Sequence, residues 1–449
     1  MKDATASPDG ATPLRRAMRA AAQNLGWLLA SRGVLAVLSL LYLGMATRAL
    51  GVTDFGRFAL ITGASQALAL CVGFQTWQIV VQYGVEHLLR DDRGALGRLL
   101  RACAFLDLGS AIAGALIGVV VIELFGRVLG IDADLKSYVL LFTLVQFLSL
   151  RSTPLGILRL RDKFSLAALA DSMTPLVRFV GSVLALFLLP TVQGFLLAWA
   201  AAEIVTAATY WVLAARTGDL QRLWSSRIDR RVLLAENPHI VRFSASTNAN
   251  STLGLSGKQV PLLLVGAYVG PAAAGAFRLA FQLAQALSKL SQLLARAAFP
   301  EIVRAARTVG AQRLRGMLGK LFLSSLAAAL IVLVIVVLAG RPLLTLVGGP
   351  DYAHAYPILL WLAAAGCLDL ATVSFEPVLM AVHRAGTAFA ARAIATALLL
   401  AAMIVLTPVQ GAIGAAIAVL VGSLATAILL GIAAAFFVGP VADAKPGRE

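Results

Sequence analysis

Long apolar stretches, separated by short segments that gather the charged residues, run through almost the whole chain. Each stretch is close to the ~20 residues that an α-helix needs to cross the hydrocarbon core of a bilayer. A transmembrane barrel would show short segments of alternating polarity, and the sequence has none. With 59% hydrophobic and 13% charged residues, the chain is also too apolar for a soluble protein of 449 residues. The sequence therefore predicts an all-α, polytopic membrane protein.

We expect twelve transmembrane helices in two bundles of six. The expected spans cover residues 25–49, 56–83, 100–126, 138–158, 166–189, 193–214, 240–268, 274–298, 318–340, 355–380, 387–407 and 412–437. The first twenty residues lack the apolar core and small-residue cleavage site of a signal peptide. The expected organisation is a cytoplasmic tail (1–21), a first bundle (22–215), a cytoplasmic linker (216–236), a second bundle (237–438) and a cytoplasmic tail (439–449).

The basic residues fall mainly on one side of the expected spans. The segments around residues 15–19, 90–101, 159–163, 216–231 and 304–320 carry most of them. The opposite loops offer Arg48, Arg57, Arg127, Lys136 and Arg341. By the positive-inside rule both termini lie in the cytoplasm. The net charge of +16 thus sits in short loops beside membrane spans, where it sets topology and attracts anionic lipid headgroups, and it does not indicate nucleic-acid binding.

One phrase occurs twice, half the chain apart. When residues 50–68 are laid over residues 269–287, Gly51 meets Gly270, Gly56 meets Gly275, and the tripeptide Gln-Ala-Leu meets itself. A second match joins PLGILRLR from Pro154 to PVLMAVHR from Pro377, each at the end of the fourth helix of its half. A duplicated six-helix unit has two halves of the same orientation, which suits a transporter that rocks two bundles about a central cavity.

One face of the expected helix over residues 274–298 is polar from end to end. Its members are Arg278, Gln282, Gln285, Lys289, Gln292 and Arg296, separated by 4, 3, 4, 3 and 4 residues. A charge near the middle of a bilayer costs about 2.5–3.5 kcal/mol on insertion scales, so this face should line a watery cavity. Arg296 is near enough to the helix end to reach the membrane surface instead. Lys258 in the preceding span and Arg32 in the first span add two further cations for the cavity.

Glutamines form a second polar pattern. Gln75, Gln78 and Gln82 are spaced by 3 and 4 residues, with Gln66 a little earlier. Amides in this arrangement can hydrogen-bond hydroxyl-rich ligands, and they can equally join neighbouring helices.

These features resemble the multidrug/oligosaccharidyl-lipid/polysaccharide exporter superfamily, and within it the bacterial polysaccharide flippases. The resemblance covers nearly the whole chain. RALGVTDFGRFAL is similar to the signature after the first helix, GAYVGPAAAGAFRLA to its second-half equivalent, and GILRLRDKF to the loop between the fourth and fifth helices. Arg32 and Arg278 occupy places similar to those of cavity arginines in the related peptidoglycan-precursor flippases. Those flippases have fourteen spans, so the twelve expected here argue against the peptidoglycan precursor as substrate.

The resemblance implies a flippase of the bacterial inner membrane that moves an undecaprenyl-pyrophosphate-linked oligosaccharide by alternating access, for lipopolysaccharide or exopolysaccharide synthesis. Its partners would be this lipid, the surrounding membrane lipids, and the polysaccharide polymerase and chain-length machinery. The residues expected to bind the pyrophosphate are Arg32, Lys258, Arg278 and Lys289. Those expected to contact the sugars are Gln66, Gln75, Gln78, Gln82, Gln282 and Gln285.

The principal alternative is a cation-coupled antiporter of the same superfamily. It would need carboxylates within the membrane, and Asp369 and Glu203 are the best candidates for coupling an ion. An enzyme is disfavoured because the expected outer loops are short, no P-loop motif is present, and the four histidines are scattered without metal-ligand spacing. The three cysteines fall inside expected spans without paired spacing. We therefore expect no catalytic residue, no metal and no cofactor.

Overall fold

The computed structural model of this chain is built of α-helices packed as two bundles. It describes residues 13–126, 131, 133–225, 229–257, 259–306, 311–376, 379 and 384–438, without the side chains of 13–32, 222, 225, 250, 255, 256, 289–306, 311–321 and 385. The helices are α1 (Pro13–Val72), α2 (Thr76–Leu89), α3 (Arg93–Phe125), α4 (Lys136–Leu148), α5 (Ser152–Leu160), α6 (Phe164–Leu188), α7 (Val192–Ala215), α8 (Asp219–Ser225), α9 (Arg230–Glu236), α10 (Ile240–Ser256), α11 (Val260–Val269), α12 (Pro271–Ala306), α13 (Ala311–Gly348), a 3₁₀-helix η1 (Pro350–Ala355), α14 (Tyr356–Ala371) and α16 (Ala385–Val438).

The helices coincide with the expected spans, but some helices join two expected spans and some expected spans are broken into two helices. In α1, two expected spans are joined at Gly51, and in α16 two are joined at Gly411. Other spans are broken, because α2 follows α1 after a gap at 73–75, α5 follows α4 after 149–151, and α11 follows α10 after 257–259. Among the described residues, eight helices or helix pairs are long and apolar enough to cross a membrane, and Val260–Val269 is a shorter apolar helix. The all-α membrane fold is therefore confirmed.

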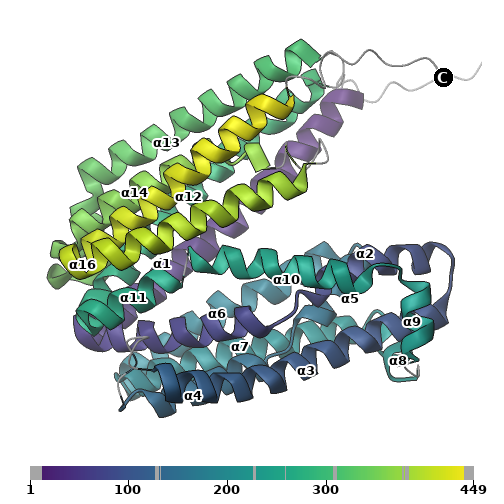
Figure 1. Cartoon of the computed structure of the whole chain (residues 1–449), viewed down its shortest axis with the longest axis horizontal. Helices are drawn as coiled ribbons and strands as arrows, with labels where there is room; N and C mark the ends of the chain where they lie inside the picture. The colour runs from purple at the N-terminus through teal and green to yellow at the C-terminus, as the bar shows by residue number, and fades with distance from the viewer. Residues whose placement is uncertain are drawn as a thin grey trace, which may run out of the picture.

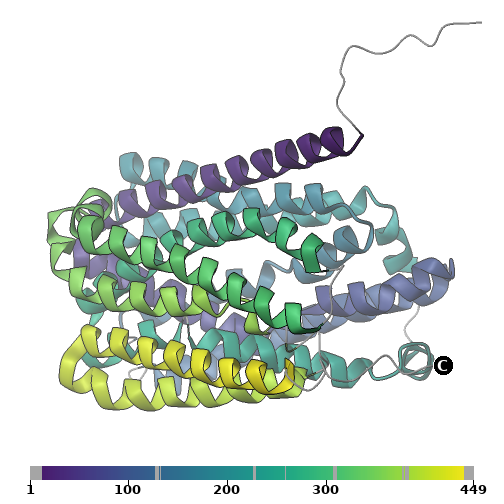
Figure 2. The same ribbon diagram turned by 90° about the horizontal axis from the view of Figure 1, so that it is seen from above.

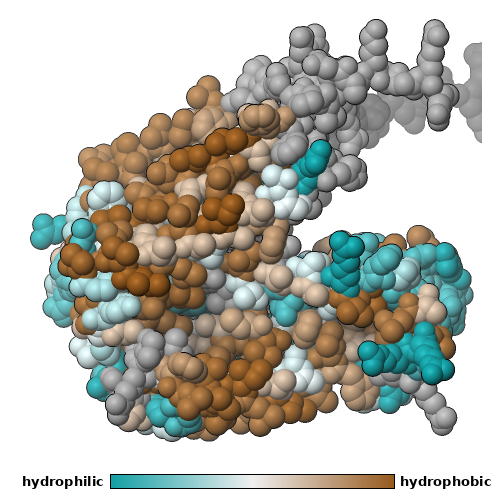
Figure 3. Space-filling view, in the orientation of Figure 1, coloured by the Kyte–Doolittle hydropathy of each residue, from teal (hydrophilic) through white to brown (hydrophobic). Residues whose placement is uncertain are grey.

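The two bundles meet at one end and diverge at the other. In Figure 1, α2 to α9 form the lower bundle, α11 to α14 and α16 form the upper one, and α10 lies between α2 and α16, which it contacts. Figure 2 shows the helices running nearly parallel, with the start of α1 along one side and α16 along the other. The space-filling view in Figure 3 is hollowed between the bundles at the end that carries α8 and α9, which we call the open end. The opposite end is the closed end.

Two glycines of the repeated phrase hold the closed end together. Gly56 of α1 and Gly275 of α12 lie against one another: a Cβ on Gly56 would lie 1.7 Å from the carbonyl oxygen of Pro271, and one on Gly275 would lie 2.5 Å from that of Val52. Side chains this small let two helices cross at backbone distance. The equivalent Gly51 and Gly270 both have positive φ, 70° and 101°, with extended ψ, a backbone conformation that glycine adopts without penalty. The internal repeat is thus present in the backbone as well as in the sequence.

Hydrogen bonds between the halves reinforce the closed end. The Thr47 hydroxyl donates to the carbonyl of Val347 (3.4 Å), and Arg48 donates to that of Leu346 (2.5 Å). The Tyr352 hydroxyl donates to the carbonyl of Gly51 (3.3 Å).

A buried carboxylate joins the broken helices of the first bundle. Asp107 of α3 is 4% exposed and accepts hydrogen bonds from the Thr76 hydroxyl (2.7 Å), the Thr153 amide (3.0 Å) and the Thr153 hydroxyl (2.6 Å). Thr76 opens α2, and Thr153 lies in the first turn of α5. A negative charge stabilises helix N-termini, so Asp107 ties together two helix starts within the membrane.

We predict that Gly56→Ala destabilises the closed end. The added methyl group cannot fit beside Pro271 unless α1 and α12 separate, and overpacking of this kind costs about 1–3 kcal/mol. Thermal unfolding of the purified protein in detergent should therefore occur at a lower temperature. The control is Gly109→Ala, because no atom lies within 4 Å of a Cβ at Gly109. Equal unfolding temperatures for the two variants would contradict a tight crossing at Gly56.

Candidate functional site

A buried carboxylate of the first bundle is surrounded by three polar side chains. Glu203 of α7 is 2% exposed. Its Oε1 lies 2.8 Å from Nη2 of Arg178 in α6, and its Oε2 lies 3.1 Å from Nη1 of Arg151. The amide of Gln146 donates to the same Oε2 (3.4 Å). Two guanidinium groups therefore share one carboxylate, and the cluster carries an excess positive charge.

The broken fourth helix supplies two of these partners. Gln146 lies in the last turn of α4, and Arg151 lies in the gap between α4 and α5. Pro154 and Pro377 are aligned at an offset of 223 residues. The same offset places Ser149, the residue after α4, opposite Thr372, the residue after α14. Both halves thus interrupt the same helix at the same place. Interrupted helices in membrane proteins are found where the backbone lines a cavity or is buried in protein.

The Arg178 side chain lies against an aromatic ring. Its guanidinium lies 5.2 Å from the centroid of the Trp199 ring, within range of a cation–π interaction. Trp199 packs edge-on against Tyr42 (5.1 Å between centroids) and Phe58 (4.9 Å). Nε of Arg178 is buried and has no hydrogen-bond partner. The Arg178 guanidinium is thus fixed by Glu203 on one side and by Trp199 on another.

Arg278 brings a further positive charge to this region from the other half of the chain. It lies in α12, three residues beyond Gly275, on the helix that packs against α1. Among the described residues, no carboxylate forms an ion pair with Arg278. The two arginines repel one another across the interface between the halves, so an anion placed between them would be stabilised by both.

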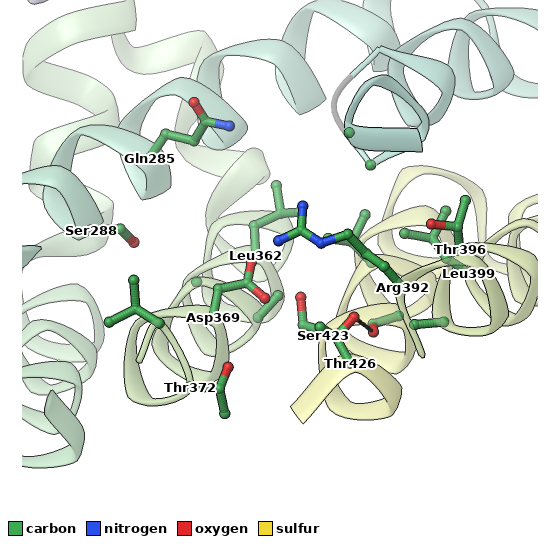
Figure 4. Close-up of a pocket in the computed structure, with 18 of the residues that line it drawn as sticks. Gln285, Ser288, Leu362, Asp369, Thr372, Arg392, Thr396, Leu399, Ser423 and Thr426 are labelled. Carbon is green, nitrogen blue, oxygen red and sulfur yellow. Dashed lines mark hydrogen bonds between the residues drawn. The ribbon is translucent and has the colours of Figure 1, made fainter. Parts of the chain in front are cut away.

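A separate cavity of about 530 Å³ lies in the second half. It is lined by residues in or next to α10, α12, α14 and α16, and Figure 4 shows polar side chains of this lining. Arg392 of α16 extends into it and pairs with Glu376 at 2.5 Å. Asp369, Gln285 and hydroxyl groups complete its polar lining. We call it the second-half cavity.

The structure brings together only part of the expected binding site. Of the expected phosphate-binding residues, Arg278 reaches the centre, whereas Lys258 and the side chains of Arg32 and Lys289 lie outside what the structure describes. Of the two expected ion-coupling residues, Glu203 is held in the arginine cluster and Asp369 lines the second-half cavity.

The expected sugar-contacting glutamines are dispersed. Gln66 accepts a hydrogen bond from Gln259 in the other half (2.8 Å), and Gln75 accepts one from the Trp77 indole (2.9 Å). Gln82 is exposed, while Gln78 and Gln282 are half-buried. Gln285 lines the second-half cavity.

Sequence reasoning missed three cations as site residues: Arg151, Arg178 and Arg392. Each lies inside an expected span, where a charge is costly, and this signal was available. The partners of these cations could not be identified from the sequence, because a pair such as Arg178 and Glu203 is 25 residues apart and lies on different helices. Among the described residues, no group of three or more His, Cys, Asp or Glu side chains could hold a metal ion.

Three comparisons show which known proteins this chain is similar to. A family model described as polysaccharide biosynthesis protein matches residues 21–306. The inner membrane protein YghQ of Escherichia coli (strain K12) is 29% identical over 348 residues, which cover 76% of this chain and 96% of the relative.

Two solved structures share the fold. The lipid II flippase MurJ, in its inward closed conformation, matches with a TM-score of 0.68 and 13% identity, covering 90% of this chain and 87% of that chain. An inward-facing multidrug resistance MATE family transporter of the MOP superfamily matches with a TM-score of 0.64 and 13% identity, covering 89% and 94%. At such identities the two structures show the fold alone.

We predict that Glu203→Gln destabilises the protein by about 3 kcal/mol, because removing one partner of a buried ion pair leaves uncompensated charge. Adding Arg178→Gln to this variant should cost less than Arg178→Gln alone, since the carboxylate is already absent. Unfolding in detergent, followed for the two single variants and the double variant, measures this coupling. Glu86→Gln is the control, because the pair of Glu86 with Arg90 is exposed and should contribute less than about 1 kcal/mol. Additive effects at Arg178 and Glu203 would contradict the cluster.

Proposed function

The chain belongs to the polysaccharide biosynthesis protein family, and from this membership we propose that it moves an undecaprenyl-pyrophosphate-linked oligosaccharide across the bacterial inner membrane. The printed names of its relatives support a membrane role. YghQ is named an inner membrane protein, and MurJ is named a lipid II flippase. The two helical bundles of this chain (Figure 1) form a fold that it shares with MurJ and with a MATE transporter. The product would serve lipopolysaccharide or exopolysaccharide synthesis.

The observation that carries the proposal is the excess of positive charge at the meeting of the two halves. Arg178 and Arg151 share the single carboxylate of Glu203, and Arg278 adds a charge from the other half. A pyrophosphate that enters the membrane loses its water shell. Guanidinium groups replace that shell with charge-assisted hydrogen bonds, often in bidentate geometry.

The remaining site assignments extend this centre. We assign pyrophosphate binding to Arg278 together with Arg32, Lys258 and Lys289. Lys289 shares the polar face of Arg278 in the expected span 274–298, and Lys258 and Arg32 lie in two other expected spans. Arg178 joins them on the geometry of the cluster. The glutamines at 66, 75, 78, 82, 282 and 285 are assigned to the sugars.

The two ends of the molecule fit alternating access. The open end carries α8 and α9 and the basic residues of the linker, so the positive-inside rule places it in the cytoplasm, together with both termini. The substrate would then enter from the cytoplasm while the Gly56–Gly275 crossing seals the other side. Separating α1 from α12 would open the outer side.

The alternative is a cation-coupled antiporter, and one observation favours it. Asp369 and Glu376 line the same cavity, where two carboxylates could hold a cation. Arg392 pairs with Glu376 in that cavity, and Glu203 is paired with arginines. These pairings occupy Glu376 and Glu203 with fixed cations, which favours the flippase.

Deletion of the gene tests the proposal directly. We expect an undecaprenyl-pyrophosphate-linked oligosaccharide to accumulate on the cytoplasmic face of the inner membrane, because its transfer to the outer leaflet stops. Mass spectrometry of extracted lipids, with a membrane-impermeant sugar-modifying reagent to assign the leaflet, measures it. Unchanged lipid-linked sugars, or resistance to cationic dyes on overexpression, would contradict the proposal and favour the antiporter.

We predict that Arg278→Gln lowers surface polysaccharide at least about tenfold in a complemented deletion strain. A hydrogen bond to a charged group contributes about 1.5–3 kcal/mol, and Arg278→Gln removes the charge. Arg278→Lys should restore part of the export because it keeps the charge. The control is Arg216→Gln at the exposed end of α7, which should export normally. Normal export by Arg278→Gln at equal expression would exclude Arg278 from pyrophosphate binding.

A further inference from the structure

One side of α3 marks both limits of the hydrocarbon core of the membrane. Between Arg101 and Glu123, this side presents large exposed apolar side chains, namely Phe105, Leu108, Ile112, Leu116 and Val119. Arg101 and Glu123 are 22 residues apart, which corresponds to about 33 Å along a helix and is close to the ~30 Å thickness of the hydrocarbon core. The side of α3 that faces lipid therefore ends at Arg101, which lies at the level of the lipid headgroups.

The short linker helix α8 is held at this same level. Nη1 of Arg101 donates a hydrogen bond to the carbonyl oxygen of Trp224 in α8 (3.1 Å). The Arg101 guanidinium also lies 5.6 Å from the centroid of the Phe105 ring, at the start of the apolar side of α3. Leu223, the neighbour of Trp224, is 3% exposed and belongs to the same hydrophobic cluster as Leu99. One side of α8 is thus buried against the first bundle, and Figure 1 shows α8 beside α3.

The other side of α8 exposes a large aromatic side chain. Trp224 is 72% exposed. Because its backbone is bonded to Arg101, its indole lies close to the headgroup level on the lipid-facing side of α3. Tryptophan is enriched at this level of membranes, where its apolar ring meets acyl chains and its N–H meets polar groups. The exposure of Trp224 is therefore explained by contact with the bilayer.

The linker around Trp224 has an excess of positive charge. Residues 216–231 contain five arginines and two aspartates. One of these carboxylates, Asp219, is 0% exposed and accepts two hydrogen bonds from Arg161 (2.7 and 2.6 Å), so it is matched by a cation of the bundle. Arg230 and Arg231 at the start of α9 are exposed. In Figure 3, hydrophilic side chains gather on the part of the open end that α8 and α9 occupy.

This charge distribution selects the occupant of the surface. Basic segments beside a membrane attract anionic lipid headgroups. A second copy of the chain would bring the same excess of arginine to this surface and would be repelled. A guanidinium has five N–H donors, so Arg101 can hold the Trp224 carbonyl and also donate to a lipid phosphate.

We propose that α8 and Arg101 form an interfacial site for anionic phospholipids of the leaflet that borders the open end. Trp224 lies among the headgroups, and Arg101 binds the lipid phosphate. This site goes beyond the proposed function, because its ligand is a bilayer lipid that stays in its leaflet and is not the transported substrate. It holds the linker, and with it the first bundle, at a fixed depth in the membrane while the second bundle moves.

The first test measures the depth of Trp224. Full-length wild-type protein and the Trp224→Phe variant are placed in nanodiscs of phosphatidylcholine that carries bromine either next to the headgroup or near the end of the acyl chain. Bromine quenches the fluorescence of an indole that it approaches, and the difference between the two proteins isolates Trp224. We expect the bromine next to the headgroup to remove the Trp224 fluorescence and the deep bromine to leave it. Nanodiscs without bromine give the reference.

The second test measures lipid affinity by native mass spectrometry of the full-length protein released from nanodiscs. The two probes are phosphatidylglycerol, which is anionic, and phosphatidylcholine, which has no net charge. We expect Arg101→Gln to lower the affinity for phosphatidylglycerol about tenfold, since a hydrogen bond to a charged group is lost, without a change for phosphatidylcholine. Arg101→Lys keeps the charge and should retain part of this affinity.

The matched control is Arg93→Gln in the same helix. Arg93 is exposed, pairs with Asp91, and lies eight residues before Arg101, which is about 12 Å farther from the hydrocarbon core. Its affinity for phosphatidylglycerol should equal that of the wild-type protein. An equal loss in the Arg93 and Arg101 variants would show diffuse attraction in place of a site and would overturn the proposal.

Two further outcomes overturn the site. Trp224 fluorescence that neither bromine quenches would place α8 in water, away from the bilayer. Unchanged affinity of Arg101→Gln for phosphatidylglycerol would exclude Arg101 as a phosphate ligand. Both outcomes leave the flippase proposal intact, because neither probe is an undecaprenyl-pyrophosphate-linked lipid.

Discussion

The cost of placing charge in hydrocarbon determines how this protein is organised. A charged side chain within a span must find a partner, a cavity or the membrane surface. Here Glu203 is enclosed by Arg178 and Arg151, Asp107 binds the starts of two helices, and Glu376 pairs with Arg392. Two of these arrangements join helices that are not consecutive in the chain: Glu203 of α7 pairs with Arg151 before α5, and Asp107 of α3 binds Thr153 of α5. Among the described residues no carboxylate forms an ion pair with Arg278, and in the proposed function a substrate anion takes that place.

Close packing at the other end provides the counterpart of these polar contacts. The crossing of α1 and α12 at Gly56 and Gly275 brings backbones together, and bulky apolar side chains surround it, including Phe55 and Phe277, which are almost fully buried. In an alternating-access transporter, each conformation is closed at one end and open at the other. The closed end and the hollowed open end of this structure fit one such conformation. Because the two glycines are equivalent positions of a repeat, the seal lies on the axis that relates the halves.

Much of the fold could be predicted from apolar runs of spanning length, and the resemblance to the exporter superfamily is confirmed by the family model and by the shared fold. The breaks at 73–75 and 149–151 and the one between α10 and α11 were not predicted, because Gly, Ser and Gln also occur inside continuous transmembrane helices and do not by themselves mark a helix end. Their positions depend on tertiary contacts such as those of Asp107 with Thr76 and Thr153. For the same reason, Glu203 could be proposed from the sequence as an ion-coupling residue, whereas its pairing with two arginines could not.

The sequence by itself determined the class of protein, the number of spans, the duplication and the presence of cations within the membrane. These follow from composition and spacing along the chain, which act locally through helix length and the energy of transfer into lipid. Only the tertiary structure decided which charges meet, that the arginines gather at the centre, and that Asp369 and Arg392 belong to a separate cavity. Such pairings join residues of different helices, and their geometry is set by how the helices pack against one another.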